Sequence, residues 1–381
     1  MACGSDCPPV CVLLSKVGAA FWLKTAFMPL RVGVDAWNLP WDRRGIGRYT
    51  RSILRRWLQW QGARLRLTLV VPERFTLAVA NRYRREVDDF TVGVCSRHAA
   101  AAQRFDVLWY PWNGMSWLSA HPSVATLHDA SVFALPPSEH EAAQREQLPF
   151  RTAAGHAKKI ITDSHFAKSE LTHYLDLTND AVEVVHLGVD TQLLSPAPRL
   201  ARGTGAEPSR YILFVGVPEE RKGLATVLEA MGRLPESLRS GVELIVAGTA
   251  DRGFLGAWSE TVRVRAVGKV DDAVLAALYA RAAALVYPSR YEGFGLPVLE
   301  AMASGAPVVA SDIPSVREAG GEAALYAAPG DPAAWAEAIG EVLVNKALQN
   351  DLRERGLKRA RTMTWDATAD QTLRVLECAA A

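Results

Sequence analysis

A twelve-residue segment, Ser289–Glu300, restricts the folds that this chain can adopt. The apolar run before it, Ala284–Pro288, is bounded by turn residues and predicts a short buried strand. Pro297 is favoured at the first position of a helix, and the predicted helix runs to about residue 304. The helix N-terminus attracts anions, and Gly293 and Gly295 have no side chain to block their approach. The segment therefore predicts a strand–turn–helix unit that can bind an anionic ligand.

Two carboxylates flank the glycine turn. Glu292 immediately precedes Gly293, and Glu300 lies early in the predicted helix. A carboxylate repels a phosphate, so both side chains are expected to accept hydrogen bonds from hydroxyl groups instead. A sugar ring and a ribose joined by a diphosphate would satisfy both carboxylates and the helix N-terminus. The pattern therefore favours a nucleotide-sugar site.

The residues around this turn resemble those of a known family. The two glutamates enclose Gly-Phe-Gly-Leu-Pro-Val-Leu, and a second strand and turn follow at 306–314. This combination is similar to the retaining glycosyltransferases of family 4, group 1, and in particular to bacterial mannosyltransferases. The resemblance extends from about Arg31 to the C-terminus. It implies an α/β GT-B fold, in which two Rossmann-like, doubly wound parallel-sheet domains face an interdomain cleft and a C-terminal helix crosses back to the N-terminal domain.

Length and composition agree with two domains. The chain has 381 residues, more than the ~250–300 at which a single core stops growing. Its net charge is only +2, whereas a nucleic-acid-binding protein usually carries a basic stripe. Cys95 and Cys378 are isolated in the sequence, which is typical of a reduced, cytoplasmic protein. The sequence leaves the oligomeric state open.

Short β-branched runs alternate with helical segments, which is typical of parallel α/β domains. The Pro- and Gly-rich segment 191–209 predicts a linker between an N-terminal domain at 28–190 and a C-terminal domain at 210–362. A final helical pattern covers 351–378, and the resemblance implies that a helix at about 363–381 crosses back with Trp365 as its anchor. Residues 1–27 are interpreted as an unstructured leader upstream of the true initiator. Lys16 and Lys24 interrupt its apolar run, so it predicts no spanning helix, although peripheral membrane contact stays open.

A basic turn follows the first strand of the C-terminal half. Arg221 and Lys222 precede a helix that starts near Leu224, so two cations and a helix N-terminus can stabilise a departing diphosphate. We therefore expect no metal site and no cofactor apart from the nucleotide-sugar co-substrate. Many family members carry Arg where this chain has Val217. Arg48 or Arg44 could supply the missing phosphate contact.

The resemblance also implies roles for individual residues. It implies that Glu300 binds the ribose and Glu292 the donor sugar. It places His128 exposed at the cleft, where the ring would bind the sugar 6-hydroxyl or orient the acceptor. The backbone of Val270 would contact the nucleobase. The remaining donor-binding residues would be Gly216, Gly293, Phe294, Gly295 and Leu296. A glycine loop resembling the acceptor-side loop that closes over the phosphate would comprise Gly45, Gly47 and Arg48, although the start of an ordinary helix explains it too.

These features favour a metal-independent retaining hexosyltransferase. The best prediction is transfer of mannose from GDP-mannose to a saccharide or polyprenyl-linked saccharide, although UDP-linked sugars could use the same residues. A nucleotide-sugar epimerase of the same fold and a non-catalytic nucleotide-sugar-binding subunit are the alternatives. An early group of tryptophans either packs in the core or stacks on an acceptor: Trp37, Trp41, Trp109, Trp112 and Trp117.

Overall fold

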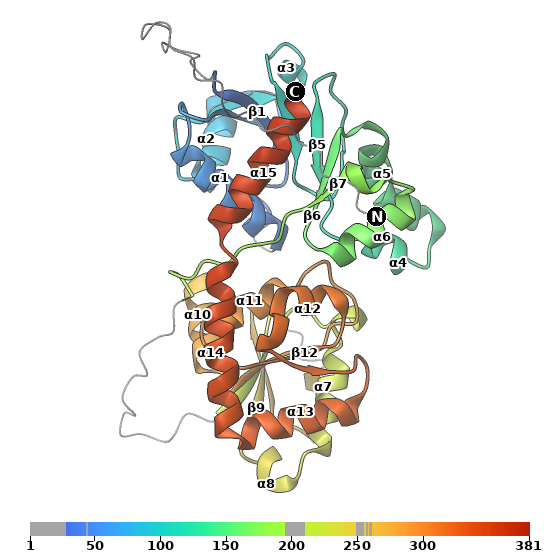
Figure 1. The fold of residues 1–381 in the computed structure, drawn as a ribbon, viewed down its shortest axis with the longest axis vertical. Helices are drawn as coiled ribbons and strands as arrows, with labels where there is room; N and C mark the ends of the chain where they lie inside the picture. Colours follow the sequence, from blue (N-terminus) through green and yellow to red (C-terminus); the bar gives the residue numbers. More distant parts are fainter. Residues whose placement is uncertain (1–27, 43–44, 195–209, 249–254, 257, 259–260) are drawn as a thin grey trace, which may run out of the picture.

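The protein contains two parallel β-sheets, one above the other in Figure 1, each enclosed by helices. The computed structural model describes residues 28–42, 45–194, 210–248, 255–256, 258 and 261–381. The predicted leader, Arg44 and residues 195–209 of the predicted linker lie outside the described residues.

The first sheet has the strand order β3-β2-β1-β4-β5-β6-β7 within the described residues. All neighbouring strands are parallel. Its strands are β1 (Leu30–Asp35), β2 (Leu65–Val71), β3 (Gly93–Ser96), β4 (Val107–Tyr110), β5 (Ser123–Thr126), β6 (Lys159–Thr162) and β7 (Val182–Val184). Its helices are α1 (Gly45–Gln59), α2 (Leu77–Glu86), α3 (Arg97–Ala100), α4 (Ser131–Ala134), α5 (His140–His156) and α6 (His165–Leu175).

The second sheet has the order β10-β9-β8-β11-β12-β13 and is also parallel. Its strands are β8 (Arg210–Val215), β9 (Val242–Ala247), β10 (Val264–Gly268), β11 (Ala284–Tyr287), β12 (Val308–Ser311) and β13 (Leu325–Ala327). The elements around it are η2 (Glu220–Lys222), α7 (Leu224–Arg233), α8 (Glu236–Arg239), α10 (Asp272–Arg281), α11 (Leu296–Ala303), α12 (Pro314–Gly320), α13 (Pro332–Val344) and α14 (Lys346–Thr362).

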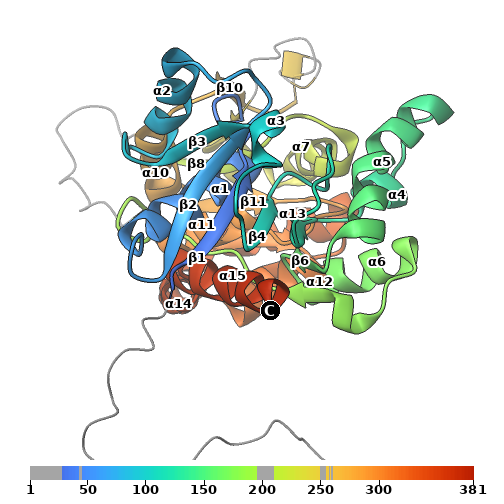
Figure 2. The same ribbon diagram turned by 90° about the horizontal axis from the view of Figure 1, so that it is seen from above.

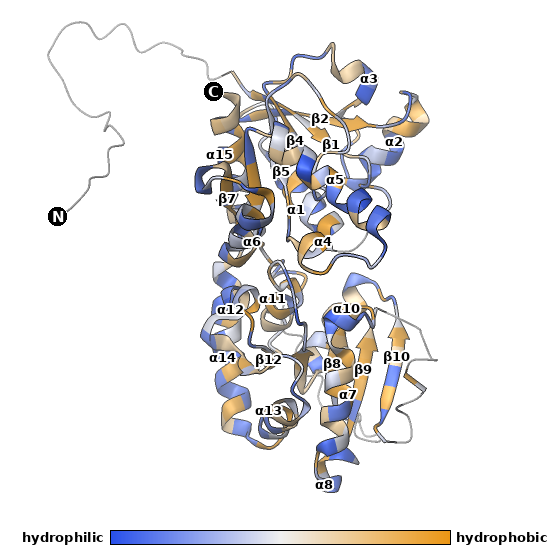
Figure 3. Ribbon diagram, turned by 90° about the vertical axis from the view of Figure 1, so that its right-hand side faces the viewer, coloured by the Kyte–Doolittle hydropathy of each residue, from blue (hydrophilic) through white to orange (hydrophobic). Residues whose placement is uncertain are grey.

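In both sheets the order in which successive strands are added reverses direction beside the first strand. In the first sheet β1 lies between β2 and β4, and in the second β8 lies between β9 and β11. Strands β4, β5, β11 and β12 are buried at every residue, because helices cover both faces of a doubly wound sheet. Figure 3 shows the apolar strands inside this helical covering. Ligands bind beyond the carboxyl ends of strands at such a switch point, which places the site between the two sheets.

The strands predicted at Ala284–Pro288 and within 306–314 are present as β11 and β12. Strand β3 was missed, because its sequence Gly93–Ser96 carries little apolar pattern and it lies at the sheet edge. The helical pattern at 351–378 forms two helices, α14 and α15 (Trp365–Ala380), and α15 corresponds to the C-terminal helix predicted at about 363–381. The break is stabilised locally, because the Thr364 hydroxyl accepts a hydrogen bond from the Ala367 N–H at 3.2 Å and caps α15.

Helix α15 lies against α1 and the first sheet, whereas α14 packs on helices α11 and α13 of the second domain (Figures 1 and 2). The chain thus passes between the sheets twice, and the two passages are adjacent: Val189 pairs with Thr364. A Cβ on Gly188 would lie 2.2 Å from the Trp365 nitrogen, so a glycine is needed there. Trp365 is buried and meets the Tyr49 ring edge-on at 6.3 Å. The crossing therefore anchors α15 on the N-terminal domain.

Among the described residues, no helix combines the length and the apolar character that crossing a bilayer requires. The two described cysteines, Cys95 and Cys378, are unpaired thiols.

Candidate active site

The segment Ser289–Glu300 and the apolar run before it form the predicted strand–turn–helix unit. Strand β11 ends at Tyr287, and α11 begins at Leu296 with Pro297 in its first turn. Gly295 adopts φ 129°, a conformation that side-chain-bearing residues rarely take. The turn lies between the two sheets, where the Ser164 hydroxyl of the first domain donates to the Gly293 carbonyl at 2.5 Å. The turn is therefore part of the interdomain contact.

Glu292 pairs with both predicted cations. Its Oε1 accepts from Lys222 Nζ at 2.6 Å, and its Oε2 accepts from Arg221 Nη1 at 3.2 Å. Burial favours the neutral acid, but the charges of Lys222 and Arg221 outweigh it and lower the pKa of Glu292 below its usual value. The carboxylate is therefore ionised. The loop after β8 and the loop after β11 thus bring three charged side chains to the carboxyl ends of adjacent strands.

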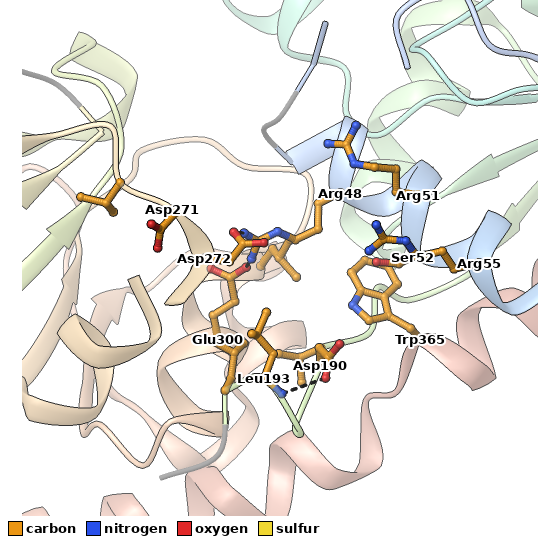
Figure 4. Close-up of a pocket in the computed structure, with 14 residues that line it drawn as sticks. Arg48, Arg51, Ser52, Arg55, Asp190, Leu193, Asp271, Asp272, Glu300 and Trp365 are labelled. Atoms are coloured by element: carbon orange, nitrogen blue, oxygen red, sulfur yellow. Dashed lines mark hydrogen bonds and ion pairs between the residues drawn. The ribbon is translucent and has the colours of Figure 1, made fainter. Parts of the chain in front are cut away.

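Glu300 is held by one residue of its own domain and one of the other. The Tyr279 hydroxyl donates to Oε2 at 2.9 Å, and Arg48, from α1, forms an ion pair with Oε1. The Arg48 guanidinium also pairs with Asp272 (Figure 4). Burial raises the pKa of Glu300, and the Arg48 charge opposes that rise. Arg48 was predicted to contact phosphate, but here it contacts the carboxylate assigned to the ribose.

A pocket of about 450 Å³ lies between the domains at Glu300. Val270, predicted for the nucleobase, and Leu296, predicted to bind the donor, line it, as does Trp365 at the domain crossing. Helix α1 contributes a basic wall of Arg48, Arg51 and Arg55, while Asp190, Asp271 and Asp272 supply carboxylates. The pocket therefore offers an apolar surface, cations and a buried carboxylate.

The prediction that His128 is exposed at the cleft was wrong, because the residue is only 8% exposed. Its Nε2 donates to the Pro111 carbonyl at 3.2 Å, and its Nδ1 lies 2.8 Å from Asp163 Oδ2. Burial alone would lower the pKa of His128, but the Asp163 charge and hydrogen bond raise it. Both ring nitrogens are thus engaged inside the N-terminal domain, and the ring has none left for a sugar hydroxyl in this conformation.

Sequence reasoning missed Asp163 as the partner of His128. A signal existed: Asp163 directly follows β6, and His128 lies two residues after β5. Because β5 and β6 are parallel neighbours, their carboxyl ends meet at the same edge of the sheet. Recognising this required the strand order, which the sequence pattern does not give.

Glu318, on α12, forms a second contact between the domains. Its carboxylate accepts from the His165 and Phe166 backbone N–H groups, both at 2.8 Å, and so caps α6. The His186 ring lies 3.2 Å from Oε2. His165, His186 and Glu318 offer ligand atoms within 4.8 Å of one another, but the carboxylate already serves as the helix cap.

The predicted glycine loop begins α1. A Cβ on Gly47 would lie 1.9 Å from the Asp42 carbonyl oxygen, whereas one on Gly45 would meet open space. Gly216 directly follows β8 and adopts φ 154°, and its carbonyl lies so close to Gly248 that a Cβ on Gly248 would approach it to 2.7 Å. Phe294 is buried and stacks on His186 with ring centroids 5.5 Å apart.

The early tryptophans divide between the core and the surface. Trp109 and Trp112 are buried and donate hydrogen bonds from their ring nitrogens, to the Thr126 hydroxyl at 2.9 Å and the Asp35 carbonyl at 2.6 Å respectively. Trp117 is partly buried, and Trp37 and Trp41 are exposed. Only the last three can therefore offer ring surface to a ligand.

Comparison with known proteins shows which family the chain belongs to. Residues 43–193 match the family model described as Glycosyltransferase Family 4, and residues 200–359 match the one described as Glycosyl transferases group 1. The chain is 32% identical over 288 residues to O-antigen chain mannosyltransferase B of Escherichia coli, covering 69% of this chain and 73% of that protein. This chain belongs to glycosyltransferase family 4. The family 4 enzyme is also 31% identical over 316 residues to phosphatidyl-myo-inositol mannosyltransferase of Mycobacterium leprae, covering 81% and 79%.

Solved structures confirm the GT-B fold of this glycosyltransferase. Anabaena HepE in complex with UDP and glucose superimposes with a TM-score of 0.72 at 15% identity, over 92% of this chain and 100% of that one. WaaG, a glycosyltransferase involved in lipopolysaccharide biosynthesis, gives 0.68 at 16% identity, over 91% and 99%. Sucrose-phosphate synthase from Thermosynechococcus elongatus gives 0.69 at 18%, over 91% and 98%.

Proposed function

We propose that this glycosyltransferase moves mannose from GDP-mannose onto a saccharide or polyprenyl-linked saccharide, with retention of configuration and without a metal ion. The observation that carries the proposal is the pairing of each buried carboxylate with a cation: Glu292 with Lys222 and Arg221, and Glu300 with Arg48. Both carboxylates flank the N-terminus of α11. A sugar at Glu292, a ribose at Glu300 and a diphosphate between them would match this charge pattern.

The chemistry of the pocket supports a guanine nucleotide. Asp271 caps α10, its Oδ1 accepting from the Val274 N–H at 2.8 Å, and its carboxylate borders the pocket beyond Glu300. A carboxylate can accept two hydrogen bonds from the ring N–H and the amino group of guanine, whereas uracil offers a single N–H on the corresponding edge. The names of the mannosyltransferase relatives support mannose as the transferred sugar.

Lys222 and Arg221 would stabilise the charge that develops on the departing diphosphate. Both are rigidly placed on η2 by their contacts with Glu292, so they need little rearrangement when the bond breaks. Two such cations and the α11 N-terminus can supply the positive charge that a metal ion supplies in other transferases. With Glu292 ionised and occupied by cations, we propose same-face transfer, in which the leaving diphosphate accepts the proton of the acceptor hydroxyl.

A lipid-linked acceptor would require peripheral contact with the cytoplasmic face of a membrane. A second cavity of about 390 Å³ on the N-terminal domain is lined by Trp117, Leu118, Arg145 and Leu148. Leu118 and Leu148 are exposed, and a basic residue beside exposed apolar side chains suits an anionic bilayer surface. This proposal is secondary to the transferase activity.

Donor consumption with and without acceptor tests the proposed function. Binding of GDP-mannose, UDP-glucose and UDP-N-acetylglucosamine to the purified protein is first measured by thermal shift. The protein is then incubated with each donor, and the products are separated. Transfer from GDP-mannose to a saccharide acceptor is expected. Epimerised donor without acceptor would identify an epimerase, and binding without turnover would identify a non-catalytic subunit. A trapped covalent glycosyl-enzyme would contradict same-face transfer, and selective use of a UDP sugar would contradict the donor assignment.

A further inference from the structure

We propose that Arg48 is a stand-in for the donor ribose. In the empty enzyme its guanidinium occupies the hydrogen-bonding position on Glu300 that the ribose hydroxyls take, and it holds the two domains together until the donor replaces it. The inference rests on the proposed function, because it requires that Glu300 binds ribose. It adds a direct competition between an interdomain ion pair and the substrate.

The contact joins the two domains at the pocket itself. Arg48 projects from α1 of the N-terminal domain, whereas Glu300 lies on α11 and Asp272 on α10 of the C-terminal domain. Figure 4 shows the guanidinium reaching across to both carboxylates. The Glu300 side chain is only 6% exposed and that of Arg48 22%, so water screens this ion pair little. The Asp272 side chain is 60% exposed and adds a weaker outer anchor.

The two oxygens of Glu300 have different partners. Oε2 accepts from the hydroxyl of Tyr279, a fully buried residue of the same domain, so this bond persists whether the domains are open or closed. Oε1 is bound by Arg48, which comes from the other domain. A ribose diol that enters the pocket therefore competes with the guanidinium for Oε1, whereas Tyr279 keeps the carboxylate in place.

The exchange also accounts for the electrostatics of the empty pocket. Burial disfavours the ionised form of Glu300 and raises its pKa, and Arg48 is the cation that opposes this. Arg48 thus holds the pKa of Glu300 below the level that burial alone would give.

If Arg48 stands in for the ribose, removing its side chain should strengthen GDP binding. A ligand that must displace an internal contact binds more weakly than one that enters a vacant site. Its apparent affinity is reduced in proportion to the fraction of molecules in which the contact is open. Arg48→Met should therefore tighten GDP binding by about fivefold to tenfold, measured by calorimetry at pH 8. Asp272→Asn, which removes only the outer anchor, should tighten it less. A donor-contacting Arg48 would give the opposite result, weaker binding.

Arg55→Met is the matched control. Arg55 lines the same pocket from the same helix, but its ion pair is with Asp88 of its own domain, at 2.7 Å. This variant measures the general effect of removing a positive charge near an anionic ligand, so the Arg48 effect is read relative to it. The ribose itself is tested with 2′,3′-dideoxy-GDP. Because this analogue has no hydroxyl to replace the guanidinium, Arg48→Met should change its affinity no more than Arg55→Met does.

The donor-free domain arrangement gives a second readout. Small-angle scattering should show a larger radius of gyration for Arg48→Met than for the wild type. The radius of gyration of the wild type should change when GDP is added but not when the dideoxy analogue is added. Weaker or unchanged GDP binding by Arg48→Met relative to Arg55→Met would overturn the stand-in role and leave the proposed function intact. Failure of the wild type to bind GDP or any sugar nucleotide would overturn both.

Discussion

The α-carbon of Gly293 lies against the backbone carbonyl of His128, so that a Cβ on Gly293 would approach the His128 oxygen to 2.1 Å. The two residues belong to different domains, and the contact joins the sugar-side turn of the C-terminal domain to the end of β5 in the N-terminal one. The glycine at this position therefore serves domain closure as well as ligand approach.

Gly293→Ala should hinder this closure. The added methyl group meets backbone, which cannot move away cheaply, so the closed arrangement is displaced while each domain keeps its own core. We expect kcat to fall by about tenfold or more with a nearly unchanged melting temperature. Gly155→Ala, in α5, is the control, because a Cβ there meets open space and should leave kcat unchanged. Wild-type turnover in the Gly293 variant would show that this closure is not needed.

Lys222→Ala should depress turnover by about two to three orders of magnitude, the scale for losing one preorganised charge contact to a developing anion. Lys222 Nζ lies 2.6 Å from Glu292 and is largely shielded from water. Arg290 is a neighbouring cation whose backbone N–H donates to the Arg221 carbonyl, but its side chain is half-exposed and pairs with the exposed Glu220, so Arg290→Ala should have little effect. Steady-state kinetics of both variants check this, and equal, small effects would contradict the assigned role of Lys222.

Tyr279→Phe should weaken donor binding with little change in kcat. The substitution removes the hydroxyl that fixes Glu300 Oε2 but keeps the buried ring. A lost hydrogen bond to a charged group is worth about 1.5–3 kcal/mol, so the donor dissociation constant should rise by about tenfold or more. The measurement is a comparison of kcat and KM for the donor. A fall in kcat at unchanged KM would place Glu300 in the chemical step instead.

Asp35 should make stability depend on pH. Burial raises the pKa of Asp35 from 3.8 to about 6, so the folded protein retains a proton that the unfolded chain has already lost between those values. Its contribution to stability therefore falls as pH rises from about 4 to about 6. The shift of about 2 pKa units corresponds to about 3 kcal/mol in the free energy of unfolding. Relative to the wild type, Asp35→Asn should gain stability across this window.

Asp106→Asn provides a control of opposite sign for that measurement. The hydrogen bond from Arg31 lowers the pKa of Asp106, so its contribution is present above the ordinary carboxyl pKa and is lost as the pH falls. The Asn variant should therefore be less stable than the wild type at neutral pH and approach it in acid. Denaturant unfolding between pH 3 and 7 checks both variants. Parallel stability profiles for wild type and Asp35→Asn would exclude a buried, raised pKa at Asp35.

Local pattern predicted a large part of this protein because its signals lie within short segments. The strand at Ala284–Tyr287, the helix entered through Pro297 and the cations at Arg221 and Lys222 could each be predicted from neighbouring residues. Hydrophobic runs fix a buried strand, and proline fixes a helix start, whatever the rest of the chain does. The carboxylates at Glu292 and Glu300 followed from the same turn.

Tertiary structure alone decided which of these residues meet. His128 and Asp163 are 35 residues apart and pair because β5 and β6 are neighbours, and Arg48 and Glu300 are 252 apart and pair across the cleft. The division of the last helical pattern at Thr364 likewise depends on the crossing beside Val189. Helical periodicity specifies a local conformation and a buried face. It carries no information about the partner of that face, which is set by strand order and domain closure.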